Sequence, residues 1–294
     1  MKPPELVAIA ELEMRDHGLQ PHFDPDALAQ AQQAGAGRSA ADKAADSGDI
    51  RDLRSRLWFS IDNADTRDLD QLSWVQQQAD GGAVLAVAIA DVDALVPRGS
   101  AADAHAAHNT TSVYTAAGVF AMLPPLLSNH LSSLHEGEDR LALVVEMHVR
   151  GDGTVGESQL FRAAVRNQAK LDYDGVSAWL DGSAPAPAAV AASKELQAQL
   201  HLHDQVAASL RHWRYQRGAL NVSTVQARPV FDDGQLVDLR ADHKNRAKDL
   251  IADLMIATNS ASARFLVARG VPTIRRVLQQ PRRWDRLMQL SAAH

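Results

Sequence analysis

The spacing of hydrophobic residues divides the chain into strand-like and helix-like segments. Short runs rich in β-branched and aromatic residues predict strands, because such side chains suit a pleated surface that the rest of the protein covers. The predicted strands are 57–61, 83–96, 144–149, 158–165, 222–225 and 237–240. Turn sequences at Asp152-Gly153 and at Asp232-Asp233-Gly234 lie between two pairs of these strands.

Apolar residues at helical spacing predict helices at both ends of the chain. The predicted helices are 5–17, 25–34, 196–213 and 243–269, with a further helical turn at 99–108. Glycine ends a helix well because it adopts a left-handed conformation without strain, and Gly18, Gly218 and Gly270 stand where three of these helices stop. Residues 1–56 therefore form an accessory helical segment, and a loose loop is expected at 35–48.

Composition limits the classes of protein that fit the sequence. The chain has 294 residues, 46% of them hydrophobic, which is enough for a sizeable core in one large domain or two modest ones. The net charge of -6 argues against a protein held on nucleic acid by its overall charge, but it allows an acidic metal site with a local basic rim.

Cysteine is absent, which excludes disulfides, zinc–thiolate sites and cysteine nucleophiles. This absence fits a reducing compartment, and we expect a cytoplasmic protein. Glu5, Glu11 and Glu13 stand where a signal peptide would need an apolar run. Because no apolar stretch approaches the length of a membrane span, we expect no contact with a membrane.

An acidic cluster follows the first predicted strand, within 60–71. Four aspartates fall in nine residues: Asp62, Asp65, Asp68 and Asp70. Like charges this close repel one another, and a bound cation or proton relieves the repulsion. A hard divalent cation such as Mg²⁺ suits these oxygen ligands. A solvated acidic loop is the alternative, whereas a calcium loop fits badly, since Arg67 and Ser73 occupy its glycine and acidic positions.

Several short motifs follow one another between residue 57 and about residue 269. They are Ile61-Asp62, Asp68, Asp70-Gln71, Val87 to Val92, Thr111 to Tyr114, Met122-Leu123-Pro124, Leu127-Ser128 and Ser133-Leu134 to Leu141. In their order and spacing they resemble the RNB catalytic domain of the ribonuclease II family.

The resemblance implies an α+β fold, in which a mixed, mainly antiparallel sheet packs against helices. Residues 57–294 would form an RNB-like catalytic domain, incomplete at its C-terminal end, behind the N-terminal segment. The implied activity is that of a Mg²⁺-dependent exoribonuclease. Such an enzyme shortens single-stranded RNA from its 3′ end and releases nucleoside 5′-monophosphates. We expect a monomer.

The resemblance also assigns candidate site residues. Asp62 and Asp68 would hold the metal, and Asp70 would hold metal or position the attacking water. Gln71 stands where the family has a carboxylate, and it offers an oxygen without charge. Candidate RNA-binding residues are Tyr114, Tyr173 and Asp253, the last a shorter replacement for the usual glutamate. A core aromatic is the alternative for Tyr114, and a half-buried structural role is the alternative for Tyr173.

Three departures from the family pattern keep a second function open. Gln71 lacks the charge, Val222 falls where a second stacking aromatic is expected, and the chain stops before an arginine-bearing segment and an S1 barrel. The alternative function is a catalytically impaired RNB-like protein that binds RNA or regulates. A third possibility is a metal-binding structural domain without RNA. Asp91 and Asp93 are either outer supports of the site or turn-capping residues.

Overall fold

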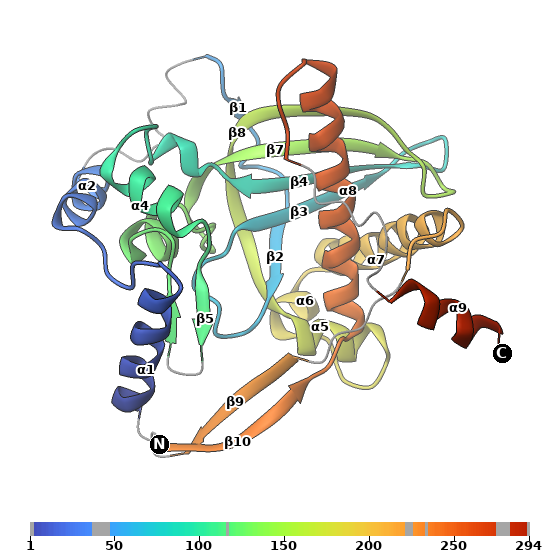
Figure 1. The fold of residues 1–294 in the computed structure, drawn as a ribbon. Coiled ribbons are helices and arrows are strands. Elements are labelled where there is room, and N and C mark those ends of the chain that lie inside the picture. Colours follow the sequence, from blue (N-terminus) through green and yellow to red (C-terminus); the bar gives the residue numbers. More distant parts are fainter. Residues whose placement is uncertain are drawn as a thin grey trace.

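The computed structural model describes residues 3–36, 48–115, 118–220, 226–232, 235–274 and 283–292. Their elements follow one another along the chain as shown in Figure 1. They are α1 (Pro3–Asp16), α2 (Pro25–Gly35), β1 (Arg51–Asp52), β2 (Trp58–Asp62), β3 (Gln71–Gln77), β4 (Ala83–Ala90), η1 (Val92–Ala94), α4 (Ala101–Asn109), β5 (Val113–Thr115), β6 (Gly118–Phe120), η2 (Leu127–Leu131), β7 (Asp139–Val149), β8 (Val155–Asp172), α5 (Tyr173–Leu180), α6 (Ala188–Ala192), α7 (Lys194–Tyr215), β9 (Gln226–Asp232), β10 (Gln235–Asp242), α8 (Arg246–Ala268) and α9 (Trp284–Ala292).

A six-stranded sheet with the order β1-β8-β2-β3-β4-β7 forms the centre of the molecule. Strand β8 also pairs with β7, so the strand pairings return on themselves. The pairs β2–β3, β3–β4, β4–β7 and β7–β8 are antiparallel, and only β8 takes parallel neighbours, β1 and β2. The predicted α+β class with a mainly antiparallel sheet is confirmed.

Helices α5 to α8 cover one face of the sheet, and α8 crosses β7 and β4 (Figure 1). Large apolar side chains fill the core on this face, including Phe59, Leu85, Leu200 and Leu250, all fully buried. Each such side chain contributes about 1.5–3 kcal/mol when it leaves water. A second core on the other face surrounds Trp58 with alanine, leucine and valine side chains. The large-residue core fixes where β2 ends, and the acidic loop begins at that point.

Helix α8 corrects the expectation that no apolar stretch is long enough to span a membrane. Among the described residues this one helix has the length and hydropathy of a span. Its residues Leu250, Ile251 and Leu254 are buried against the sheet and α7. A core helix needs the same apolar composition as a spanning helix, and packing against the sheet accounts for the composition of α8.

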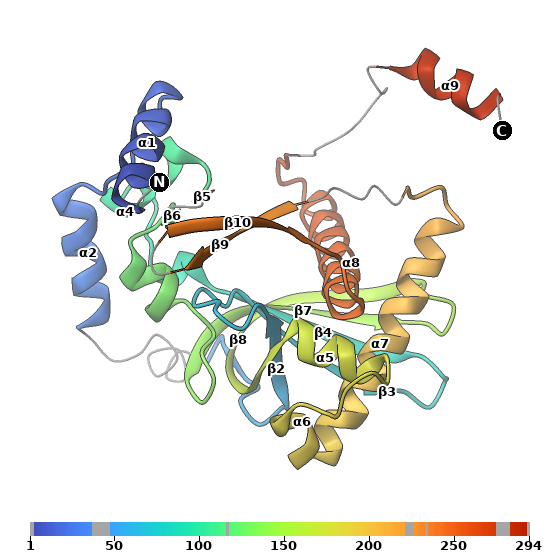
Figure 2. The ribbon, with the colours of Figure 1, turned by 90° about the horizontal axis from the view of Figure 1, so that it is seen from below.

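The N-terminal helices lie on the far side of β2 from α7 and α8, beside α4 (Figure 2). A separate small core joins them to the rest of the protein. It contains Ala31 of α2, Ala102 of α4, Leu123, and Leu127 of η2. Residues 51–52 belong to the sheet, because β1 pairs with β8. The expected boundary at residue 56 stays a prediction.

Four strands differ in length from their predictions, and the strand predicted for 222–225, which includes Val222, lies outside the described residues. Strand β10 runs from Gln235 to Asp242 instead of over 237–240. The strand predicted for 83–96 ends at Ala90, because Asp91 leaves the sheet to pair with Arg162, 2.8 Å away. Arg162 also pairs with Asp93. Strands β7 and β8 are longer than predicted, since each continues beyond its apolar run with polar side chains.

The three arginines before β2 support the sheet. Each guanidinium has a partner on β7 or β8, so these side chains stabilise the fold. The partners are Asp139 for Arg54, Glu146 for Arg56 and the ring of Phe161 for Arg51.

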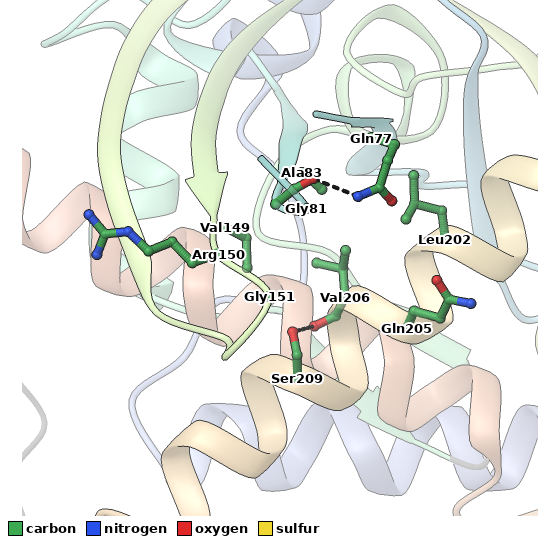
Figure 3. Close-up of a pocket in the computed structure, with 11 residues that line it drawn as sticks. Gln77, Gly81, Ala83, Val149, Arg150, Gly151, Leu202, Gln205, Val206 and Ser209 are labelled. Atoms are coloured by element: carbon green, nitrogen blue, oxygen red, sulfur yellow. Dashed lines mark hydrogen bonds between the residues drawn. The ribbon is translucent and has the colours of Figure 1, made fainter. Parts of the chain in front are cut away.

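Two hairpin turns meet α7 at the end of the sheet far from the acidic loop, around a cavity of about 160 Å³ (Figure 3). Glycine is required there by close backbone approach. A Cβ on Gly82 would lie 2.8 Å from the carbonyl oxygen of Val149, and one on Gly153 would lie 2.1 Å from that of Ser209. The described lining residues of this cavity include no acid and no histidine.

Candidate active site

The acidic loop joins the end of β2 to the start of β3 and is bent by hydrogen bonds to its first aspartate. The Oδ1 atom of Asp62 accepts from the backbone nitrogen of Asn63 (2.6 Å) and from the hydroxyl of Thr66 (2.7 Å). The chain therefore turns sharply directly after β2. Asp68 and Asp70 follow on the return path, and both are exposed.

Lys170 of β8 holds this loop from below. Its ammonium donates to the carbonyl oxygens of Thr66 (2.8 Å) and Ala64 (3.2 Å). Charged donors make stronger hydrogen bonds than neutral ones, so one side chain fixes the two middle residues of the loop. Because these carbonyls lie between Asp62 and Asp68, Lys170 sets how the two carboxylates face each other.

The second half of the loop is held by the segment before β7. The buried hydroxyl of Ser133 donates to the carbonyl of Arg67 (2.8 Å) and accepts from the nitrogen of Leu69 (2.9 Å). The nitrogen of Leu134 donates to the carbonyl of Leu69 (2.9 Å). These three bonds lie on both sides of Asp68, so its backbone position is fixed although its side chain is exposed.

The carboxylates of the loop act on one another electrostatically. The pKa of Asp70 is raised, first because surrounding protein atoms displace water from it, and then because Asp62 and Asp68 repel its charge. A cation among the three would remove that repulsion. Within the described ranges, no three acidic or histidine side chains converge closely enough to enclose an ion. The carboxylate oxygens of Asp62, Asp68 and Asp70 fit a hard cation chemically. To enclose one, their side chains would have to rotate toward it.

Tyr114 stands on the β5–β6 hairpin beside this loop. It is 67% exposed, so the alternative of a core aromatic is wrong. Its hydroxyl donates to Oδ2 of Asp68 (3.3 Å). Burial of the phenol oxygen and the nearby carboxylates, Asp68 foremost, raise the pKa of Tyr114. Val119 lies opposite Tyr114 in the hairpin and is also exposed, so the two present an apolar platform.

Tyr173 approaches the same carboxylates from another direction. It is the first residue of α5, directly after Asp172, which lies opposite Asp62 in the β2–β8 register. Its side chain is half-buried. Burial raises the pKa of Tyr173, and the charges of Asp62 and Asp70 raise it further. The ammonium of Lys248 lies 6.0 Å from its ring centroid. The two tyrosines and the acidic loop therefore share one site.

A cavity of about 370 Å³ opens between the acidic loop, the β5–β6 hairpin and the segment 121–129. This volume lies in the range of ligand sites. Asp68 and Arg67 line it on the loop side, Tyr114 and Val119 on the hairpin side, and Ser128 at η2. An aromatic ring, a cation and a carboxylate thus converge on one space.

Gln71 begins β3 and is 8% exposed. Its amide nitrogen donates to the carbonyl of Ile61 in the neighbouring strand at 3.5 Å, a weak contact. The nitrogen end of the amide therefore faces the protein, which leaves the oxygen as the end suited to a cation. Its role as a metal ligand stays a prediction.

A profile of the RNB domain matches residues 50–292, five-sixths of the chain. The chain belongs to the RNB family. Ribonuclease R of Thermotoga maritima is 32% identical over 233 residues, which cover 79% of this chain and 32% of that protein. Exoribonuclease 2 of Edwardsiella piscicida is 34% identical over 220 residues, which cover 74% of this chain and 34% of that protein.

A solved RNB structure shares the fold. Mycoplasma genitalium RNase R, in complex with ribose methylated single-stranded RNA, aligns with a TM-score of 0.78 at 25% identity. The alignment covers 87% of this chain and 39% of that one. The family that the motifs indicated is confirmed, and the match extends beyond the predicted limits at both ends. The chain spans about a third of the length of the curated RNB relatives.

Asp253 lies apart from the other candidate residues of this RNB chain. It is 3% exposed on α8, and its carboxylate pairs with Arg211 (2.7 Å) and Arg214 of α7. Burial raises its pKa, and the two guanidinium groups oppose that rise. This arrangement joins α7 to α8. A contact between Asp253 and RNA stays a prediction, and the observed contacts give the residue a structural role.

The sequence motifs did not indicate the residues that hold the acidic loop in shape. Ser133 lies in one of the motifs shared with the family and Lys170 lies three residues before Tyr173, yet neither had an assigned role. Asn167 was missed entirely. Its amide donates to the hydroxyl of Ser60 (3.1 Å) and to the carbonyl of Leu134 (2.9 Å), and it ties the end of β2 to the Ser133 segment. Their partners are mostly backbone atoms, which leave no mark in a sequence.

Proposed function

We propose that this chain carries the catalytic part of a Mg²⁺-dependent 3′-to-5′ exoribonuclease, which acts on single-stranded RNA and releases nucleoside 5′-monophosphates. The observation that carries the proposal is the hydrogen bond between the exposed Tyr114 and Asp68, which line one cavity together, with Asp62 and Asp70 in the same acidic loop. RNB relatives named Ribonuclease R and Exoribonuclease 2 support it.

The reaction would replace the bond between phosphorus and the 3′ oxygen of the penultimate nucleotide. The oxygen of water attacks the phosphorus, the 3′ oxygen leaves and takes a proton, and a nucleoside 5′-monophosphate is released. A bound Mg²⁺ supplies neutralisation of the phosphate charge and a more acidic water. Asp62 and Asp68 would hold it with the oxygen of Gln71, and Asp70 would hold it or orient the attacking water. The pKa of Asp70 is raised because its negative charge is unfavourable in this loop, and a bound cation would stabilise that charge.

Recognition of a single strand would rest on stacking. An exposed ring takes a base of any sequence only when that base is unpaired, because its π face must be free. Tyr114 presents such a ring, and its hydroxyl oxygen lies 3.3 Å from the carboxylate of Asp68. A base stacked there would lie next to the acidic loop. Tyr173, close to Asp62 and Asp70, would contact the scissile region from the other side.

A second candidate function is an RNB-like RNA-binding or regulatory protein with an impaired catalytic site. Two observations favour it. Gln71 is neutral where the family pattern has an acid, and the acidic side chains do not enclose an ion among the described residues. The cavity and the exposed Tyr114 would serve RNA binding equally well in that case.

The deciding experiment uses end-labelled single-stranded RNA with Mg²⁺ or with EDTA. We expect progressive shortening from the 3′ end with Mg²⁺ alone, and nucleoside 5′-monophosphates as products by chromatography. Asp70→Asn should lower the rate by orders of magnitude and leave RNA affinity roughly unchanged, because the loss falls on the transition state.

Asp80→Asn is a matched control on a distant turn, where the side chain accepts from the backbone of Gly82 and lies 3.5 Å from Nε2 of His148. It should keep the wild-type rate. Binding of RNA without shortening would reject the exoribonuclease and support the second function, an RNA-binding protein. Neither retention nor shortening would reject both functions.

A further inference from the structure

We propose that the N-terminal helices position the Tyr114 hairpin for RNA, and that Asn109 is the positioning residue that joins the two. The inference rests on the proposed function and deepens it, since it assigns a role to the accessory segment. That segment lies outside the acidic loop and contributes no residue to the described lining of the cavity.

Asn109 ties the N-terminal segment to α4 through a reciprocal pair of hydrogen bonds. Its Oδ1 accepts from the backbone nitrogen of Gln20 (2.9 Å), and its Nδ2 donates to the carbonyl of the same residue (2.8 Å). The side chain thus pairs with Gln20 as a neighbouring strand would. Asn109 is 2% exposed, and a buried amide that loses such partners costs stability. The segment between α1 and α2 is therefore fixed to the last residue of α4.

The attachment point lies at the base of the hairpin. Thr110 follows Asn109 directly and has a left-handed backbone with φ of 58°. The chain reverses there and enters β5, which carries Tyr114 four residues later. Such a backbone is strained for threonine and persists only when the surroundings hold it. The amide of Thr110 donates to the carbonyl of Ala106 (2.8 Å), and the pair between Asn109 and Gln20 holds the residue directly before it. Together these contacts constrain the direction in which the hairpin leaves α4.

Helix α2 supports the same region from behind. The side chain of Gln30 donates to the hydroxyl of Ser100 (3.0 Å) and accepts from the nitrogen of Ala102 (3.0 Å), both at the start of α4. Ala31 of α2 packs in one small core with Ala102 and with Leu127 of η2. Residues 125, 128 and 129, at or next to η2, line the cavity. The N-terminal helices thus back the hairpin and the facing wall together.

The consequence is preorganisation of an exposed aromatic platform. Tyr114 has little packing of its own, since its ring is largely in solvent and its hydroxyl makes one hydrogen bond, 3.3 Å long, to Asp68, so its position depends mainly on the backbone that carries it. A platform held in place loses less freedom when a base stacks on it, which raises affinity. The chemical step depends on the acidic loop, which Lys170 and Ser133 hold independently. Loss of the attachment should therefore act on RNA binding and spare catalysis.

The test is a double-mutant cycle between Asn109→Ala and Tyr114→Ala in the full chain. We expect Asn109→Ala to raise KM for a short single-stranded RNA by roughly fivefold, toward the lower end of the loss of one stacked base, with kcat within about twofold. In the Tyr114→Ala background the same change should leave KM unaltered, because the platform is already gone. Asn109→Asp keeps the acceptor and loses the donor, and it should give an intermediate KM.

A control separates positioning from general destabilisation. Gln199→Ala removes another buried amide that accepts from a backbone nitrogen, that of Val75 (3.1 Å), on the helix-covered face of the sheet. It should lower thermal stability and leave KM unchanged. Equal KM shifts in Asn109→Ala and Gln199→Ala would overturn the inference, as would a full KM shift by Asn109→Ala in the Tyr114→Ala background.

Hydrogen exchange gives a readout that needs no activity. Asn109→Ala should speed exchange of the amides of β5 and β6 (Val113–Thr115 and Gly118–Phe120), and Gln199→Ala should not. Should the wild-type protein neither bind nor shorten RNA, the proposed function fails. Exchange then still reports whether the N-terminal helices hold the hairpin. Unchanged exchange at β5 and β6 in Asn109→Ala overturns the positioning role in either case.

Discussion

His203 should make the stability of this protein depend on pH in a range where most side chains do not titrate. The residue is fully buried on α7, and its ring meets Phe59 of β2 edge-on, with centroids 4.8 Å apart. Its Nδ1 faces the carbonyl oxygen of Gln199 at 2.8 Å, and its Nε2 is buried without a partner. A proton on Nε2 would be a buried charge, so burial lowers the pKa of His203 from 6.5 to about 4.

The sign and size of the effect follow from proton linkage. Below pH 6.5 the unfolded chain binds a proton at this histidine and the folded chain does not, so stability falls as the pH falls toward 4. Between pH 7 and pH 5 the free energy of unfolding should drop by about 2 kcal/mol from His203 alone. Above pH 7 the residue contributes no pH dependence, because both states are neutral.

Urea unfolding at pH 7, 6 and 5, followed by circular dichroism, measures this drop. His203→Phe keeps a planar ring beside Phe59 and cannot take a proton, so its free energy of unfolding should fall by about 2 kcal/mol less than that of the wild type between pH 7 and pH 5. His201→Phe, two residues away on the exposed side of α7, is the matched control and should lose as much as the wild type. The reasoning is refuted when wild type and His203→Phe weaken equally with acid.

The other predictions concern the loop and its surroundings. Lys170→Met should raise the Mg²⁺ concentration for half-maximal cleavage, because the carbonyls of the loop lose their charged donor. Lys170→Arg keeps a charged donor and should bring that concentration part of the way back to the wild-type value. Equal midpoints in the wild type and both variants would contradict this role of Lys170. Gln71→Asp should lower that midpoint, and a magnesium titration showing no change would place residue 71 outside the metal ligands. Asp253→Asn should lower the free energy of unfolding by about 2 kcal/mol, less than for a fully buried pair because both arginines are partly exposed, and leave RNA affinity unchanged. Weaker RNA binding at unchanged stability would instead assign Asp253 to RNA.

The elements that the sequence predicted well are those with a strong period. Helices α7 and α8 lie close to their predicted limits, since the apolar residues at helical spacing that predicted them form the faces that pack against the sheet. The end of the strand at residue 90 could not be predicted. It depends on an ion pair between Asp91 and Arg162, which lie 71 residues apart in the chain. Local composition carries no information about a partner so distant.

The candidate site shows the same division. Its acidic residues were found because a cluster of like charges is unusual in a sequence, and motif spacing marked Tyr114 and Tyr173. The exposure of Tyr114 was not predictable, because an aromatic residue in a strand suits a core as well as a surface. For Asp253, the motif alone did not predict the contacts of the side chain. Its spacing matched a family position, yet two arginines from another helix occupy its carboxylate.

The geometry of the site depends on residues that bind backbone atoms rather than one another. Lys170 and Ser133 hold carbonyl or amide groups of the acidic loop, and Asn109 holds those of Gln20. Backbone partners can be supplied by any residue type, so the acidic loop can vary in sequence between its aspartates and still be held in the same shape. Among these aspartates, Asp62 caps the turn after β2 and Asp68 accepts from the hydroxyl of Tyr114. A loop held in this way can tolerate the repulsion among its carboxylates, because the backbone contacts oppose the loop opening that repulsion alone would favour. That repulsion remains available to favour a bound cation.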